Sequence, residues 1–421
     1  MKFIVIAALL FAVSAFAQPA VSPEVHPDGR VTFRLPAPKA REVRVYCEGV
    51  KSSAMQRETN GVWTFTTDSL EPDIYSYSFS VDGLRLLDPN NSCQKYNLLN
   101  CDSLVEVPGP KSLPWEINDV PRGELHHHFY HSAAAGDDRD YIVYTPPGYQ
   151  PSAWKKYPVL YLLHGYSDDT SAWATAGRAN VILDNLIARG QARPMIVVMP
   201  LGYGTMEIVK AGWGRVRDPN LWQRNVDKFS AALLGEVLPQ VEKEYRVSRD
   251  RQSRAIAGLS MGGTESLVVG LNHPDQFAWI GAFSSGGLNT NYVTQFPKLN
   301  ASANGRLRLL WVSCGRDDQL VKATVSSPTG SPPGTSATPG WKRTASTAFA
   351  SGGAIWPRLR PCSFNRKNNP AAAASPPGQQ KRHPESTGCL EREKWITSSR
   401  RGSRPWPLSR RGISRLSSRR S

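Results

Sequence analysis

Long apolar runs, acidic residues near the C-terminus and metal-ligand spacings are all scarce in this sequence of 421 residues. Its longest apolar stretch, residues 3–13, is shorter than the about 20 residues that a membrane-spanning helix needs. We therefore expect no membrane-spanning segment. With 40% apolar and 9% aromatic residues, the chain can still build packed cores, and its length allows two or three domains.

Acidic residues are scarce only at one end. Residues 331–421 hold 18 Lys and Arg but 3 Asp and Glu, which leaves 33 basic and 32 acidic groups in the rest of the chain. Of the net charge of +16, the C-terminal segment therefore carries +15 and the rest of the chain +1. The nearly neutral body excludes a basic protein that binds nucleic acid or membranes, so we predict neither partner.

Cysteine and histidine do not suggest a metal site or a cofactor. None of the six cysteines has metal-ligand spacing, and Cys47 and Cys314 fall in strand-like runs that favour buried thiols. Residues 126–128 and His131 are all histidine, but consecutive strand residues alternate between faces. An exposed opening strand is the preferred interpretation, with a metal cluster as the alternative.

Residues 1–17 have the features of a secretory signal peptide. Lys2 supplies the positive charge, an apolar stretch follows, and Ala15-Phe16-Ala17 forms a small-x-small cleavage site. A buried N-terminal helix or an anchor is the alternative. The mature protein is thus expected to be secreted or periplasmic, where Cys93 and Cys101 could pair in a disulfide.

Residues 21–105 predict a small all-β sandwich, because short alternating runs are separated by turn residues. Tyr75, Tyr77 and Phe79 share one face of the longest run. They form either the sandwich core or a platform on which sugars stack. The stretch resembles the immunoglobulin-like, glycogen-binding-type domain that precedes the catalytic domain of many secreted carbohydrate esterases. The predicted strands are Val31–Leu35, Glu42–Tyr46, Val62–Phe65 and Ile74–Val81.

A Pro-rich linker, residues 106–122, precedes a different pattern over residues 123–322. There, continuous apolar runs alternate with amphipathic ones, such as residues 227–245. This pattern predicts an α/β fold with a parallel sheet covered by helices on both faces. The predicted strands are Asp140–Tyr144, Val159–Leu163, Met195–Met199, Arg254–Ala257, Trp279–Ser284 and Arg308–Ser313.

The pentapeptide Gly258-Leu259-Ser260-Met261-Gly262 lies between a strand-like and a helix-like run. A sharp strand-to-helix turn presents a serine hydroxyl above the sheet, and the flanking glycines, Gly258 and Gly262, avoid collisions inside the turn. The start of the following helix favours negative charge on a bound acyl oxygen. This arrangement predicts Ser260 as a nucleophile.

An upstream strand, residues 161–163, ends in His164-Gly165. In α/β-hydrolases the loop after this strand and the residue after the nucleophile supply the two oxyanion-hole amides. We therefore nominate the backbone N–H groups of Tyr166 and Met261. His164 precedes the serine, whereas the general base of this fold comes last in chain order, so His164 is predicted to be structural.

The acid of a catalytic triad is expected after a late strand. Residues 309–314 end in Gly315-Arg316-Asp317-Asp318, which fits this position. Of the two aspartates, Asp318 is preferred as the carboxylate that would orient the base.

Residues 123–320 resemble the family of enterochelin esterases, feruloyl esterases and related carbohydrate esterases. The resemblance implies an α/β-hydrolase fold, Ser260 as the nucleophile and Asp318 as the acid. The matching segments are Tyr144–Tyr149, Leu163–Gly165, Arg193–Pro200, Tyr245–Val247, Ala257–Gly263, His273–Phe277 and Gly315–Asp318.

The family pattern also requires a later Gly-x-His-x-aromatic-x-x-Trp segment that carries the base. The chain lacks this segment, and its only histidine beyond Lys322 is His383. The general base is therefore unassigned.

A frameshift explains this absence. When each codon is read from the third base of the one before, Trp341-Lys342 forces glutamate and Trp356-Pro357 forces alanine. Between them, the shifted frame permits Gly-Val-His-Ser-Phe-Arg-Val-Trp, with the histidine spanning the codons of Ser346 and Thr347. We hypothesise that the segment 323–421 is an out-of-frame, disordered tail. A genuine basic tail that binds acidic polymers is the alternative.

Together these features predict a secreted serine esterase without a cofactor, acting on a polysaccharide or small ester substrate. The resemblance favours feruloyl or acetyl groups on plant polysaccharide, and the chain as written is expected to be inactive. Siderophore-ester hydrolysis or acyl transfer are alternatives within the enzyme class. A carbohydrate-binding protein without catalysis is the alternative of another class, and the oligomeric state stays open.

Overall fold

The computed structural model describes residues 21–152, 154–216, 218–286, 292–299, 303–315, 318 and 320. The predicted signal peptide, Asp317, His383 and the predicted out-of-frame tail lie outside the described residues.

Two antiparallel sheets form the N-terminal part, as the alternating runs predict. The four-stranded sheet has the order β1-β2-β6-β5; the six-stranded sheet has the order β4-β3-β7-β10-β9, and β8 pairs with β7. The strands are β1 Glu24–Val25, β2 Val31–Pro36, β3 Val43–Cys47, β4 Ser53–Ala54, β5 Gln56–Arg57, β6 Val62–Thr66, β7 Asp73–Val81, β8 Leu84–Leu86, β9 Gln94–Lys95 and β10 Asp102–Val107.

The aromatic row of β7 lies in the core between these two sheets. Tyr75, Tyr77 and Phe79 are 5%, 1% and 0% exposed, and the ring of Phe33 from the other sheet lies 4.6 Å from that of Tyr77. The prediction of a sandwich core is confirmed. The alternative, a sugar-stacking platform, is wrong for these three rings because no sugar can reach them.

The Pro-rich connecting segment is hydrogen-bonded to helix α1 (Ala179–Ala188) and to the residue that follows it. The side-chain amide of Asn185 donates to the carbonyls of Pro114 and Glu116 at 2.7 and 2.8 Å. Arg189, just past the helix, donates to the carbonyls of Lys111 and Ser112. Because these bonds satisfy backbone carbonyls that have no strand partner, they give the segment a defined path.

A seven-stranded sheet with the order β11-β12-β14-β13-β15-β16-β17 forms the second part. In this order the strands from β14 to β17 are parallel, but β12 is antiparallel to both β11 and β14. The expectation of a fully parallel sheet is therefore wrong at this edge, where the β11–β12 hairpin needs no helical crossover. The strands are β11 Glu124–Ser132, β12 Asp137–Thr145, β13 Val159–Leu163, β14 Ile196–Pro200, β15 Arg254–Leu259, β16 Trp279–Phe283 and β17 Leu309–Ser313.

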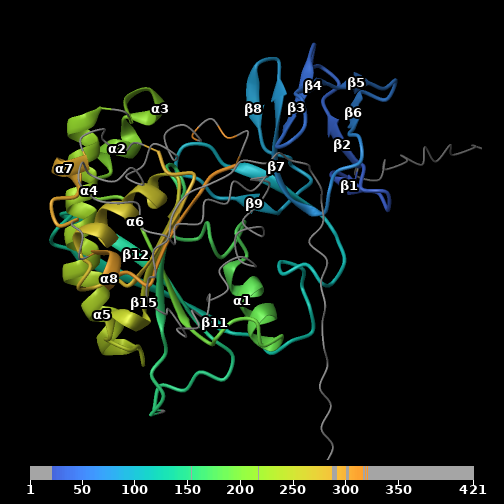
Figure 1. The fold of residues 1–421 in the computed structure, drawn as a ribbon. Helices are drawn as coiled ribbons and strands as arrows, with labels where there is room; N and C mark the ends of the chain where they lie inside the picture. The colour runs from blue at the N-terminus through green and yellow to red at the C-terminus, as the bar shows by residue number, and fades with distance from the viewer. Residues whose placement is uncertain are drawn as a thin grey trace, which may run out of the picture. The chain divides into compact units, whose positions relative to one another are not determined.

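Helices cover both faces of this sheet, as predicted (Figure 1). Alternate residues of β13 point to opposite sides: Tyr161 packs with α4 to α6, and Leu162 packs with α1. The remaining helices are α2 Glu207–Lys210, α3 Gly212–Arg215, α4 Pro219–Ala232, η1 Leu233–Val237, α5 Leu238–Glu244, η2 Arg251–Ser253, α6 Met261–Asn272, α7 Tyr292–Gln295 and α8 Ala303–Arg306.

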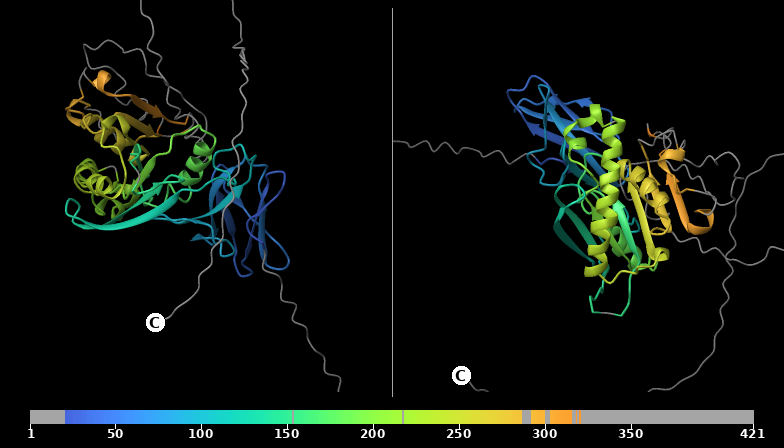
Figure 2. Two further views of the ribbon diagram at one scale, coloured as in Figure 1. Left: turned by 90° about the horizontal axis from the view of Figure 1, so that it is seen from below. Right: turned by 90° about the vertical axis from the view of Figure 1, so that its left-hand side faces the viewer.

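The amphipathic run predicted over residues 227–245 is part of a longer helix. Helices α4 and α5 are joined through the π-helical segment η1 into one continuous rod (right-hand view of Figure 2). The rod starts at Pro219 because the Asp218 side chain caps it, accepting from the amides of Asn220 and Leu221. In the described part of the chain, no helix combines the length and apolarity needed to span a bilayer.

The four described cysteines are unpaired, so the disulfide that Cys93 and Cys101 could have formed is not present. The strand register explains why. The carbonyl of Cys93 accepts from the amide of Leu104, three residues beyond Cys101, and Ser103 pairs with Gln94. At about 3.4 Å per residue this offset places the two cysteines about 10 Å apart, beyond the roughly 7 Å between Cα atoms that a disulfide tolerates.

Candidate active site

Ser260 occupies the turn between β15 and α6. Its backbone has φ 55° and ψ −113°, an unusual conformation for a residue with a side chain, and its amide donates to the carbonyl of Phe283 at 2.8 Å. Such strain is concentrated at functional sites, where the surrounding structure holds it. The Ser260 side chain is half-buried, and no side chain among the described residues hydrogen-bonds to its hydroxyl. The Ser260 hydroxyl is not among the buried polar atoms of the described residues that lack a partner, so it is open to approach.

The glycines on either side of Ser260 are required by close backbone contacts. A Cβ on Gly258 would lie 2.5 Å from the carbonyl carbon and oxygen of Gly262. A Cβ on Gly262 would lie 2.6 Å from the carbonyl oxygens of Leu163 and His164. The Gly262 amide donates to the His164 carbonyl at 3.2 Å. These contacts join the serine turn to the end of β13.

The two amides nominated for an oxyanion hole lie on these joined segments. A Cβ on Gly165 would lie 3.6 Å from that of Ser260, so the turn that contains Tyr166 faces the serine. Met261 is the first residue of α6, where helix amides have no intrahelical partner. Among the described residues, neither the Tyr166 nor the Met261 amide donates a hydrogen bond. The side chains of both residues belong to one buried apolar cluster with Tyr203, Ile208, Val209 and Leu221.

His164 is structural, as predicted from its place in the chain. It is 2% exposed; its Nδ1 donates to the Gly165 carbonyl, and its Nε2 accepts from the Gly202 amide, both at 2.8 Å. Since both ring nitrogens are engaged, His164 has none left for Ser260. Burial also lowers the pKa of His164, which keeps the ring neutral.

Asp318 follows β17 at the same edge of the sheet as Ser260. Strand β16 lies between β15 and β17, and all three are parallel, so their carboxyl ends meet at one edge. At about 4.7–4.9 Å per strand, the ends of β15 and β17 are about 10 Å apart. Asp318 is half-buried, its Oδ1 accepts from the Leu320 amide at 2.8 Å, and its amide donates to Gly315. The carboxylate of Asp318 is therefore held in place through one of its two oxygens.

No described histidine can act as the base for Ser260. His273 terminates α6, a helix of 12 residues whose first residue follows Ser260, so about 18 Å of helix separates the two. The histidines of residues 126–128 and His131 lie on β11, at the opposite edge of the sheet from β17. The described residues thus place the predicted nucleophile, Ser260, and the predicted acid, Asp318, at one edge of the sheet, with no described histidine beside them.

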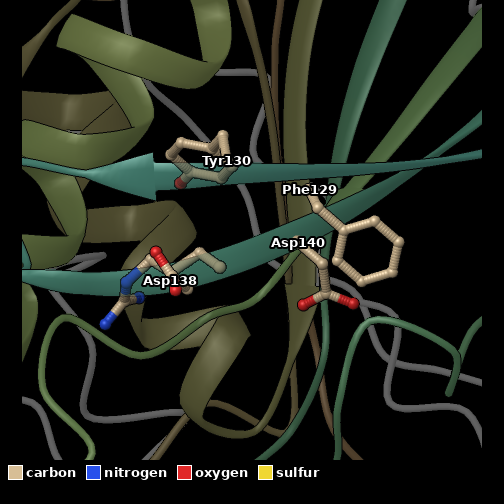
Figure 3. A pocket seen from close by; sticks show the side chains of 5 residues that line it. Phe129, Tyr130, Asp138 and Asp140 are labelled. Carbon is tan, nitrogen blue, oxygen red and sulfur yellow. The ribbon is translucent and has the colours of Figure 1, made fainter.

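The predicted opening strand of histidines is confirmed as β11. Phe129 stands on its exposed face, beside a hollow of about 500 Å³ whose lining is Phe129, Tyr130, Asp138, Arg139 and Asp140 (Figure 3). The Asp140 carboxylate accepts from Thr170 and pairs with His127, each at 2.7 Å. Within the described residues, no group of three or more His, Cys, Asp or Glu is placed to hold a metal ion. The hollow contains none of the predicted site residues.

Sequence reasoning missed a buried polar connection behind the serine. Glu265, on the second turn of α6, is 0% exposed and accepts from the side-chain amide of Asn225 at 3.3 Å. The Asn225 Oδ1 in turn accepts from the amides of Gly204 and Thr205. This connection ties α6 to the loop that also binds His164. An acid among the small and apolar residues of 261–271 was the only sequence signal for it.

Burial raises the pKa of Glu265 well above its ordinary value and so favours the protonated carboxyl group. Its Oε2 has no partner among the described residues. A carboxyl group whose pKa is higher in the folded state than in the unfolded state contributes to stability while it is protonated in both. This contribution is complete below the unfolded-state pKa and is lost as the pH rises towards the folded-state pKa. The protein is therefore expected to lose stability above about pH 4.5 through Glu265.

Glu265→Gln is expected to remove this loss. The amide keeps the acceptor for Asn225 but cannot ionise in the unfolded chain, so the melting temperature at pH 8 should be higher than that of the parent. At pH 4 the variant and parent should melt together. Glu71→Gln, at an exposed residue, controls for the lost charge. Equal melting of Glu265→Gln and the parent at both pH values would contradict a neutral Glu265.

A family model named Esterase matches residues 132–358, which is more than half of the chain. The chain belongs to the esterase family. The match includes the strand-turn-helix segment of Ser260 and continues past residue 322, into residues that the structure does not describe.

Curated relatives of this esterase-family chain are longer than the part they share with it. An endo-1,4-beta-xylanase/feruloyl esterase from Xylanibacter ruminicola is 31% identical over 300 residues, covering 70% of the chain and 39% of the relative. Endo-1,4-beta-xylanase Y from Acetivibrio thermocellus is 29% identical over 148 residues, covering 32% of the chain and 12% of the relative. The chain thus spans well under half the length of either.

Solved structures agree with the fold of the esterase family. The enterochelin esterase from Shigella flexneri superposes with a TM-score of 0.54 at 20% identity, covering 72% of the chain and 85% of that protein. The ferric enterobactin esterase from Salmonella typhimurium superposes with a TM-score of 0.51 at 21% identity, covering 72% of the chain and 86% of that protein. At these identities the structural likeness establishes the fold alone, in which β strands precede the mixed sheet along the chain.

Proposed function

We propose that the protein is a serine esterase in which Ser260 attacks the carbonyl carbon of a carboxylic ester. The observation that carries this proposal is the strained turn at Ser260, with an accessible hydroxyl beside two amides that donate to none of the described residues. An oxyanion placed beside Ser260 would accept hydrogen bonds from the N–H groups of Tyr166 and Met261. The N-terminus of α6 favours the same negative charge.

The reaction divides into two steps. In the first, the Ser260 oxygen bonds to the acyl carbon, the base takes the serine proton, and the ester C–O bond breaks as that proton passes to the departing alcohol. In the second, the base takes a proton from water as the water oxygen attacks the acyl carbon; the bond between that carbon and the Ser260 oxygen then breaks, the base returns the proton to Ser260, and the acid is released. The carboxylate of Asp318 would orient the base and stabilise its protonated form.

The base in this proposal is the histidine that the shifted reading frame encodes across the codons of Ser346 and Thr347. The C-terminal part of the family match falls on these residues. The chain as written is therefore proposed to retain only the weak catalysis of an oxyanion hole and bound substrate.

Acyl groups on plant polysaccharide, feruloyl or acetyl, are the proposed substrates. The Xylanibacter ruminicola relative, whose name combines a xylanase with a feruloyl esterase, supports this class. The Shigella flexneri enterochelin esterase shares the fold at lower identity, which leaves a siderophore ester as the second candidate. A protein that only binds sugars is not favoured, because the aromatic row that suggested it is buried.

Acyl release by a frame-restored chain tests the substrate class. Feruloylated and acetylated arabinoxylan fragments and enterobactin are supplied at equal concentrations, and the released acids are quantified by liquid chromatography. We expect release from at least one arabinoxylan ester at a kcat/KM at least about 10-fold above that for enterobactin. Ser260→Ala should abolish both activities. Faster hydrolysis of enterobactin would assign the siderophore ester instead.

Export through residues 1–17 is also part of the proposal. Expression with the native N-terminus in a bacterium with a secretion system should yield a mature chain that begins at Gln18, as read by N-terminal sequencing. A cytoplasmic chain that keeps Met1 would contradict export.

A further inference from the structure

The turn that carries the Tyr166 amide is strained. It reverses the chain from Gly165 to Asp168, whose amide donates to the Gly165 carbonyl at 3.2 Å. Ser167, in the middle, has φ 73°, in the left-handed region that residues with a Cβ rarely occupy. A single residue in this region costs of order 1–3 kcal/mol and persists only when its surroundings hold it.

Much of what holds this turn comes from the loop between β9 and β10, about 70 residues earlier in the chain. The Leu98 amide donates to the Ser167 carbonyl at 2.7 Å. The side-chain amide of Asn97 donates to the Ser167 hydroxyl at 2.8 Å and to the Asp168 carboxylate at 3.1 Å. Lys95 pairs with the same carboxylate at 3.2 Å. Ser167 and Asp168 are 4% and 9% exposed, so these bonds are shielded from water.

Asn97 also organises its own loop. Its Oδ1 accepts from the amides of Leu99 and Asn100, both at 3.0 Å, so the whole side-chain amide group is engaged. Leu99 packs against the apolar cluster that contains the side chains of Tyr166 and Met261. The strands on either side of the loop, β9 and β10, are hydrogen-bonded into the six-stranded N-terminal sheet. The loop is therefore anchored at both ends in that sheet.

We propose that Asn97 is a positioning residue that holds the Tyr166 amide in place for the oxyanion. The N-terminal sheets are then part of the catalytic apparatus and not a separable module that only binds sugar. This inference rests on the proposed function, because it takes the Tyr166 amide as an oxyanion donor. Displacing such a donor weakens hydrogen bonds that matter most in the transition state, so the loss should fall on kcat.

Three variants separate the roles of Asn97. Asn97→Ala removes every bond of its side chain. Asn97→Asp keeps the oxygen that accepts from Leu99 and Asn100 but places a carboxylate where the donor to Asp168 was. Asn91→Ala is the matched control, because Asn91 donates to Tyr77 and to the Leu104 carbonyl within the N-terminal part and does not contact the turn.

Hydrogen exchange in the full chain as written is the first measurement. Peptides covering residues 164–170 should exchange at least about 10-fold faster in both Asn97 variants and at the parent rate in Asn91→Ala. Kinetics of the frame-restored chain on p-nitrophenyl acetate are the second. Both Asn97 variants should lose at least about 10-fold in kcat with KM within about twofold, less than the roughly 10²–10³-fold loss on removing an oxyanion donor.

The outcomes distinguish the inference from the proposed function. Unchanged hydrogen exchange in the Asn97 variants would refute the claim that Asn97 holds the turn at Tyr166 in place. Faster exchange with unchanged kcat would overturn the positioning role while leaving the esterase activity intact. A frame-restored chain without any activity would overturn the proposed function, and the positioning role with it.

Discussion

Restoring the reading frame beyond residue 322 is expected to raise the rate of p-nitrophenyl acetate hydrolysis by at least about 10³-fold over the chain as written. The described residues supply an accessible Ser260, Asp318 and two amides with no described acceptor, but no histidine beside them. A serine hydroxyl without a base is a weak nucleophile at neutral pH. The restored frame would supply the missing triad histidine together with the C-terminal segment that carries it, so the gain should be large.

The matched control is the restored chain with only its new histidine codon changed to alanine. This variant keeps the restored C-terminal segment, so a return to the activity of the chain as written assigns the gain to the imidazole. Stopped-flow or plate-based absorbance at saturating ester, corrected for spontaneous hydrolysis, gives all three rates. Equal rates for the written and restored chains would refute the frameshift hypothesis, as would an uninterrupted reading frame in resequenced DNA together with tail peptides in mass spectrometry.

The sequence predicted most of the strands that bury a continuous or alternating apolar run. Strand β13, for example, has five buried residues in a row and was predicted with its observed bounds, Val159–Leu163. Strand β10 was missed, and so were the short strands β1, β4, β5, β8 and β9, which have no fully buried residue. The start of the rod at Pro219 was missed because its first turns carry polar residues, although the Asp218-Pro219 capping signal was present. Antiparallel pairing of β12 was also missed, since the direction of a neighbouring strand leaves no mark on a strand's own residues.

The site residues, like the strands, divide into those that the sequence could place and those that it could not. Ser260, Met261 and the glycines beside them are close in sequence, so one local motif places them together. Asp318 was placed by its position after a late strand. Asn97 and its partner Ser167 are about 70 residues apart in different parts of the chain. No periodicity or spacing links such residues, and only the folded chain brings them together.

Gly262→Ala is expected to destabilise the protein by at least about 3 kcal/mol, or to lower its melting temperature by roughly 6–12 °C. The added methyl group would lie 2.6 Å from the carbonyl oxygens of Leu163 and His164. These are backbone atoms at the end of a buried strand, so neither can move aside without distorting the sheet. The Gly262 amide would also lose its 3.2 Å bond to His164.

Two other glycine variants calibrate this effect in the same chain. A Cβ on Gly270, on the same helix, would meet the flexible end of Ile280 at 2.7 Å, so Gly270→Ala should cost about 1–2 kcal/mol. A Cβ on Gly235 meets nothing within 4 Å, and Gly235→Ala should stabilise the rod by about 0.5–1 kcal/mol. Thermal melts followed by circular dichroism should therefore rank the three variants Gly235, Gly270, Gly262, from most to least stable. Because the Gly262 contact locks the serine turn onto β13, a Gly262 variant as stable as the Gly270 variant would show that the turn is not held in this way.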